Sequence, residues 1–143
     1  MSIQTWSISE IERLTGGLSN DVLILKNNYN REQIIRWRRL ANLGDVYLNT
    51  LLKEIHYELS DSFSKDSDRL KSRKHLEEVA RHLGIDRRNY LGHPGETIEA
   101  IIAGIYQHSR QGEAKRFVYE CVMDKQIKLP NERVPWPDGG YRY

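Results

Sequence analysis

The sequence predicts an all-α protein folded as a single domain. Apolar residues recur at the helical period after Asp45 and again over residues 98–105. Ser9, followed three residues later by Glu12, forms a capping pattern for a first short helix, which the Gly-Gly pair at 16–17 would end. The chain has 143 residues, which is long enough for one domain with a substantial core.

The central part of the sequence predicts two helical segments that meet near a glycine. Asn30 is placed to cap the first of them, and we expect this helix to be broken or bent near Gly44. The second helix begins at Asp45 and runs to about Leu59, with an apolar stripe at the helical period. Before both helices, residues 22–25 (Val-Leu-Ile-Leu) fit either a helical turn or a buried extended segment.

The second half of the sequence continues the helical pattern. Residues 61–68 are polar and turn-like, and Gly84 and Pro94 mark a helix stop and a helix start. The helices that we expect here span residues 67–72, 74–83, 96–108 and 112–124. The helical domain therefore covers residues 1–124, and the proline-containing segment 125–143 is expected to form an irregular tail.

The composition excludes several classes of protein. Hydrophobic residues make up 38% of the chain and charged residues 29%, as in ordinary globular domains. No apolar run approaches the roughly 20 residues of a membrane helix, and the N-terminus lacks the basic start and apolar core of a signal peptide. We therefore expect a protein of the cytoplasm or of an organelle interior, with no membrane partner. The single cysteine, Cys121, is expected to be a buried core thiol.

Three acidic residues stand where helix packing does not require them. Asp45 opens one predicted helix, and Glu96 and Glu99, three residues apart, share a face of another. Acids at this spacing are usually solvated surface residues. If the two helices meet, however, the three carboxylates would form a site for a hard divalent cation such as Mg²⁺. Divalent metals held by carboxylates support phosphodiester hydrolysis.

Four blocks of the sequence resemble the ribonuclease III family, in the family's order. Residues 43–46 read Leu-Gly-Asp-Val before a long apolar helix, and residues 69–85 resemble the helices that follow in the family. Residues 98–106 (Ile-Glu-Ala-Ile-Ile-Ala-Gly-Ile-Tyr) are similar to its Phe-Glu-Ala-Leu-Ile-Gly-Ala-Ile-Tyr block. Residues 112–118 resemble the helix that closes the domain, so the resemblance covers about residues 30–120.

The resemblance implies an all-α ribonuclease III-like endonuclease domain. Members of the family are homodimers that cleave double-stranded or structured RNA with Mg²⁺, and Mn²⁺ is the alternative ion. By position, Asp45 matches the motif aspartate and Glu99 the essential late glutamate, which implies a catalytic role for both. The implied metal ligands are Asp45, Glu96 and Glu99, with Glu96 standing where full-length enzymes have an aspartate.

The signature motif also departs from the family pattern. Full-length enzymes read Glu-Phe-Leu-Gly-Asp, whereas residues 41–45 read Ala-Asn-Leu-Gly-Asp. Ala41 cannot bind a metal, and it lies one helical turn before Asp45, so one carboxylate is missing from the implied site. Asn42 replaces the aromatic residue that seats against the second subunit, which leaves the dimer contact open. Residues 40–45 resemble the short branch of the family, mini-ribonuclease III, which has no separate RNA-binding domain.

Basic residues flank the segments that carry the acids. The formal net charge is only +2, so the clustering of these residues is more informative than their number. Solvated helix faces account for such clusters about as well as nucleic-acid binding does. The residues that we expect to contact RNA phosphates are Arg38, Arg39, Lys71, Arg73 and Lys74.

Two further functions are consistent with the sequence. Ala41 and Asn42 favour a catalytically inactive ribonuclease III-like domain that acts as an RNA- or protein-binding component of a larger assembly. An unrelated helical protein-interaction domain is the other alternative. A zinc site at His75 and His82 is disfavoured, because neither residue has an acidic or thiol partner at ligand spacing.

Overall fold

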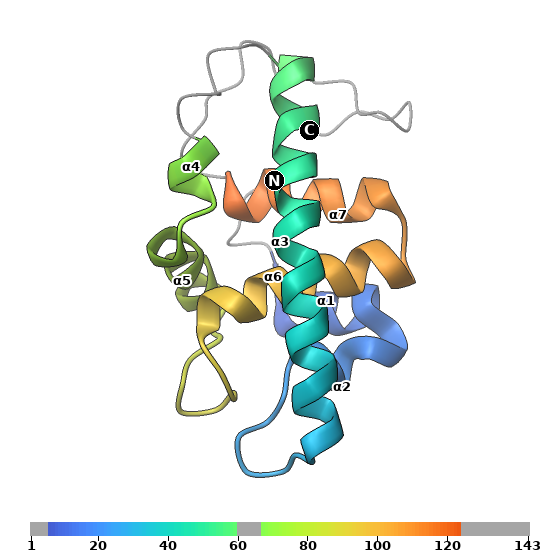
Figure 1. Ribbon diagram of the computed structural model, residues 1–143, viewed down its shortest axis with the longest axis vertical. Coiled ribbons are helices and arrows are strands. Elements are labelled where there is room, and N and C mark those ends of the chain that lie inside the picture. Colours follow the sequence, from blue (N-terminus) through green and yellow to red (C-terminus); the bar gives the residue numbers. More distant parts are fainter. Residues whose placement is uncertain (1–5, 60–66, 124–143) are drawn as a thin grey trace.

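The computed structural model describes residues 6–59 and 67–123 as an assembly of helices (Figure 1). In chain order these are α1 (Ile8–Thr15), the 3₁₀-helix η2 (Gly16–Leu18), α2 (Ser19–Val22), α3 (Arg31–Leu59), α4 (Ser67–Leu70), α5 (Arg73–His82), α6 (Pro94–His108), α7 (Gln111–Phe117) and the π-helical turn η4 (Val118–Val122). Within the described ranges, strand-type pairing is limited to an isolated antiparallel bridge between Leu25 and Tyr90. The all-α prediction is confirmed. No helix in these ranges combines the length and apolar character that a membrane span requires.

Helix α6 lies at the centre of the domain. It packs against α1, α3, α5 and α7, and Figure 1 shows it crossing behind the long helix α3. Pro94 occupies its first turn, where a missing N–H costs nothing, and the His93 side chain accepts a hydrogen bond from the Gly95 N–H at 3.0 Å. Ten of its residues are buried, which leaves Glu96 and Glu99 as half-buried exceptions near its N-terminal end.

Helix α3 is continuous through Gly44, so a break there, one of the two predicted alternatives, is wrong. A side chain at this position is excluded by packing, because a Cβ built on Gly44 would lie 1.7 Å from the Glu99 carbonyl oxygen. The glycine therefore allows the backbones of α3 and α6 to approach closely. The predicted cap at Asn30 is confirmed: its Oδ1 accepts from the Gln33 N–H at 2.9 Å, and the Gln33 side chain accepts from the Asn30 N–H at 2.8 Å.

The first helix begins earlier than its capping pattern predicted. Ser7, not Ser9, is the N-cap of α1, and its hydroxyl accepts from the Glu10 N–H at 3.2 Å. Ser9 lies inside the helix because the chain already turns at Ile8. The predicted glycine stop is confirmed, with Gly16 at a φ of 51°.

Residues 22–25 combine the two predicted alternatives, a helical turn and an extended segment. Val22 is the last residue of α2, and the chain then extends so that the Ile24 carbonyl accepts from the Leu91 N–H at 2.8 Å. Later helices match their predicted spans to within a few residues, except that the last one becomes π-helical after Phe117. Cys121 is buried as predicted. The polar segment predicted at 61–68 lies mostly outside the described residues, and the tail 125–143 lies wholly outside them.

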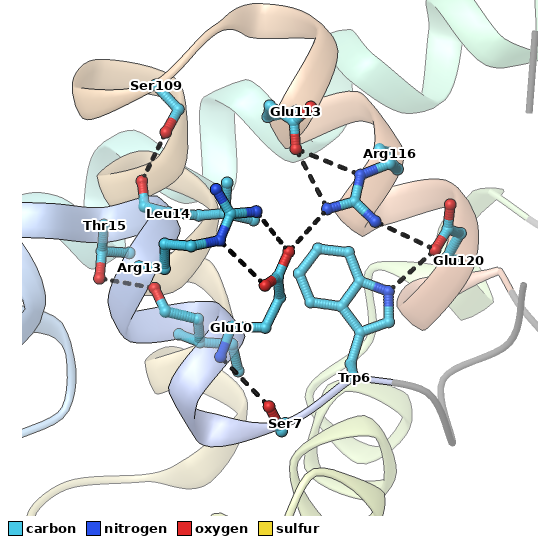
Figure 2. Close-up of polar contacts among 11 residues, drawn as sticks. Trp6, Ser7, Glu10, Arg13, Leu14, Thr15, Ser109, Glu113, Arg116 and Glu120 are labelled. Carbon is cyan, nitrogen blue, oxygen red and sulfur yellow. Dashed lines mark hydrogen bonds and ion pairs between the residues drawn. The ribbon is translucent and has the colours of Figure 1, made fainter.

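A polar network joins the start of the described chain to its end (Figure 2). The Arg116 guanidinium lies 4.4 Å from the centre of the Trp6 ring and forms ion pairs with Glu10 and Glu113, both at 3.1 Å. The Trp6 indole N–H donates to the buried Glu120 carboxylate at 3.0 Å. This network fixes α1 against α7 and η4.

Candidate metal and phosphate site

The three predicted acids lie together. Asp45 on α3 and both Glu96 and Glu99 on α6 line one pocket of about 370 Å³. Two of the predicted basic residues, Lys71 and Arg73, line the same pocket. The other lining residues are Ala41, Asn42, Leu76 and Gly95. The structure thus brings five of the eight predicted site residues into one place.

The close approach of α3 and α6 sets the position of the acids. Gly44 sits against the backbone of Glu99, so the next residue, Asp45, is held beside the Glu99 side chain. Glu96 lies in the first turn of α6, where a carboxylate is favoured by the helix dipole, and Glu99 follows one turn later on the same side. The sequence analysis predicted a break or bend at Gly44 and did not predict this packing role.

The Glu99 carboxyl is unusual in its electrostatics. Its pKa is raised to about 8, first by burial, then by the hydrogen bond and the negative charge of Asp45, and then by the charge of Glu96. The Arg73 guanidinium acts in the opposite direction and lowers the pKa of Glu99. Near neutral pH the Glu99 carboxyl therefore holds a proton, which allows it to donate a hydrogen bond to Asp45.

The two basic residues of the pocket have defined partners. Arg73, the first residue of α5, pairs with Glu96 at 2.8 Å between Nη2 and Oε1. The Lys71 ammonium donates to the Asn49 side-chain oxygen at 2.9 Å and lies 3.7 Å from Asp68. Asn49 is a residue that sequence reasoning missed, since no motif distinguished it from other polar residues of α3.

The remaining predicted RNA contacts lie outside the pocket lining. Arg38, Arg39 and Lys74 are all exposed. Arg38 precedes Asp45 by seven residues, or two helical turns, so it lies on the same side of α3 as the pocket. Arg39 points to a different side of this helix. Lys74 follows Arg73 on α5.

His75 and His93 have structural partners. His93 caps α6 through Nδ1, its Nε2 lies 3.3 Å from Glu77, and burial together with the charge of Arg73 lowers its pKa. Buried His75 contacts the Val122 carbonyl oxygen at 2.6 Å through Nε2, whereas His82 is exposed. This arrangement gives no support to a zinc site at His75 and His82.

The donor chemistry of the pocket fits a hard divalent cation, although the acids are not gathered around one point. Within residues 6–59 and 67–123, no three Asp, Glu, His or Cys side chains are arranged so that they could hold a metal ion together. Asp45 and Glu99 face each other, while Glu96 is engaged by Arg73. Carboxylate oxygens suit Mg²⁺, which binds one or two protein carboxylates and keeps several waters. Asn42 adds an amide to the lining, and Ala41 offers no oxygen.

Comparisons with known proteins return nothing for this chain. No protein-family model matches it, and no match is found among curated proteins or solved structures. Membership of the ribonuclease III family therefore stays a prediction, based on the sequence blocks described above.

Proposed function

We propose that this protein is a Mg²⁺-dependent endoribonuclease that cleaves double-stranded or structured RNA as a homodimer. One observation carries the proposal: three carboxylates from two helices line the same pocket as two basic side chains. Carboxylates suit a divalent metal, and lysine and arginine suit a phosphodiester backbone. A pocket with both kinds of group is suited to phosphodiester hydrolysis.

The residues divide into two roles in this proposal. Asp45 and Glu99 would hold Mg²⁺, with Mn²⁺ as the alternative ion, and Glu96 would join them as a ligand when its ion pair with Arg73 opens. When bound, the ion would supply charge neutralisation at the scissile phosphate and a more nucleophilic water. Lys71 and Arg73 would bind neighbouring phosphates and so position the duplex without reading its sequence.

An exposed apolar stripe on α3 supports the homodimer. Ile35, Val46 and Tyr57 are spaced eleven residues apart, which places them on one side of this helix at intervals of about three turns. All three are exposed, Tyr57 to 89%. A second copy packed on this stripe in a two-fold arrangement would cover the apolar surface and would pair the two pockets, one for each strand of a duplex.

Incubation of the purified protein with duplex RNA, with and without Mg²⁺, tests the proposal. We expect metal-dependent cleavage by the wild type and a loss of at least about 100-fold in Asp45→Asn and Glu99→Gln, because each replaces a carboxyl group, which becomes an anionic ligand when a metal displaces its proton, with an amide that cannot ionise. Glu78→Gln, a change at an exposed glutamate of α5, is the matched control and should retain activity. Cleavage that survives both pocket substitutions would exclude this function.

A non-catalytic RNA-binding domain is the second candidate, and Ala41 favours it. Ala41 is buried, lines the pocket and lies one turn before Asp45. A carboxylate at this position would reach the site, but the alanine side chain has no oxygen to offer a metal. This candidate predicts duplex binding that weakens steeply with salt, without turnover at any metal concentration. The cleavage assay above separates the two candidates.

A further inference from the structure

The ion pair between Arg73 and Glu96 lies in the lining of the pocket. Its two side chains come from the first turns of α5 and α6, and their charged atoms are 2.8 Å apart. The Arg73 side chain is 67% exposed and that of Glu96 is 34% exposed, so solvent reaches both partners of the ion pair.

A guanidinium and a divalent cation would compete for the same carboxylate. While Arg73 holds Glu96, the Glu96 oxygens point to the guanidinium and the pocket already contains one neutralising positive charge. Lys71 is held differently, by Asn49 and Asp68, and has no ion pair with the three acids among the described residues. Arg73 is therefore the basic residue whose position determines whether Glu96 is available.

We propose that Arg73 is an autoinhibitory counter-ion of Glu96, which lowers the affinity of the pocket for divalent metal until the ion pair opens. The inference rests on the proposed function, in which Asp45, Glu96 and Glu99 hold the metal. Arg73 acts through Glu96 and is a positioning residue in this role. Opening of the ion pair frees the Glu96 carboxylate, which already lines the pocket, to bind a metal ion.

Titration of the full chain with Mn²⁺, followed by electron paramagnetic resonance of the free ion, tests this inference. We expect Arg73→Gln to bind Mn²⁺ about fivefold more tightly than the wild type, the effect of losing a partly exposed ion pair. Arg73→Lys, which keeps the charge, should stay close to the wild type. Arg87→Gln is the matched control, because Arg87 is 65% exposed and pairs with the 37% exposed Glu77 at 3.2 Å. It should leave Mn²⁺ affinity unchanged.

A double-mutant cycle shows whether Arg73 acts through Glu96. In a Glu96→Gln background, Arg73→Gln should no longer tighten Mn²⁺ binding. Equal affinities of wild type and Arg73→Gln, or the same tightening in both backgrounds, would overturn the inference and leave the proposed function standing. If neither the wild type nor any variant binds Mn²⁺, the proposed function fails as well. Circular dichroism melts of each variant establish that all are folded.

Discussion

At the scale of single residues, the Glu99 carboxyl links the pocket to the pH dependence of stability. Its pKa of about 8 in the folded state lies above the ordinary value of 4.5. The folded protein therefore binds this proton more tightly than the unfolded chain, and the free energy of unfolding falls as pH rises from about 4.5 to about 8. The difference between the two pKa values corresponds to at most about 5 kcal/mol. Solvent screens this half-buried carboxyl, so we expect its contribution to the fall, which is absent in Glu99→Gln, to be about 2 kcal/mol.

Urea unfolding measures this difference in pH dependence. Wild type and Glu99→Gln are compared at pH 5 and pH 9 (roughly the two ends of that range), with a chelator present. Glu78→Gln serves as the control, because Glu78 is exposed on α5 and does not line the pocket. It should follow the wild type at both pH values. An unchanged pH dependence in Glu99→Gln would show that Glu99 does not carry the raised pKa.

Ala41 supports a second prediction at the residue scale. Because it lines the pocket one turn before Asp45, Ala41→Glu would place a fourth carboxylate there. We expect Mn²⁺ to bind about tenfold more tightly, since one more anionic ligand adds of the order of 1.4 kcal/mol. Calorimetric titration measures the affinity, and Ala41→Gln separates the charge from the bulk of the side chain. Equal affinities of the two variants would contradict the prediction.

At the scale of elements, the crossing of α3 and α6 depends on Gly44. Alanine is the better helix former by about 1 kcal/mol, but its Cβ would lie 1.7 Å from the Glu99 carbonyl oxygen. The two backbones must then separate, so we expect Gly44→Ala to lower the free energy of unfolding by about 2 kcal/mol or more. Gly17→Ala is the control, because no atom lies within 4 Å of the Cβ it would add. Chemical denaturation measures both, and equal stability of the two variants would refute this packing role.

The helices themselves were largely predictable from the sequence, because their signals are local. The Asn30 cap, the Gly16 stop and the Pro94 start depend on residues within one turn. The continuity of α3 was not predictable in this way. A glycine inside a helical pattern is read as a break when only its own propensity is considered. Gly44 is required inside α3 because the backbone of Glu99 on α6, more than fifty residues later in the sequence, packs against it.

The sequence predicted which acidic residues belong to the candidate site, but not how they pair with one another and with basic residues. Spacing and resemblance selected Asp45, Glu96 and Glu99, and the structure places all three at one pocket. Which partner each acid takes depends on tertiary contacts: the Arg73–Glu96 ion pair joins two helices with a loop between them, and Asp45 meets Glu99 because two backbones touch. No pattern along the chain encodes these pairings.

At the scale of the whole molecule, Arg116 ties the two ends of the described chain together. It stacks on Trp6 and pairs with Glu10, Glu113 and the buried Glu120, as Figure 2 shows. Arg116→Met keeps much of the aliphatic packing but leaves Glu120 buried without its cationic partner. Removing one member of a buried ion pair is costly, so we expect the free energy of unfolding to fall by about 3 kcal/mol.

Arg13→Met is the matched control for Arg116→Met, because Arg13 is exposed and also pairs with Glu10, at 2.7 Å. An exposed pair of this kind contributes less than about 1 kcal/mol, so the control should stay near the wild type. Thermal and urea unfolding, with Trp fluorescence as one probe, measure both variants. If Arg116→Met is no less stable than Arg13→Met, α1 is held against α7 by apolar packing, including the edge-on contact of Trp6 with Phe117 at 5.1 Å, and not by this network.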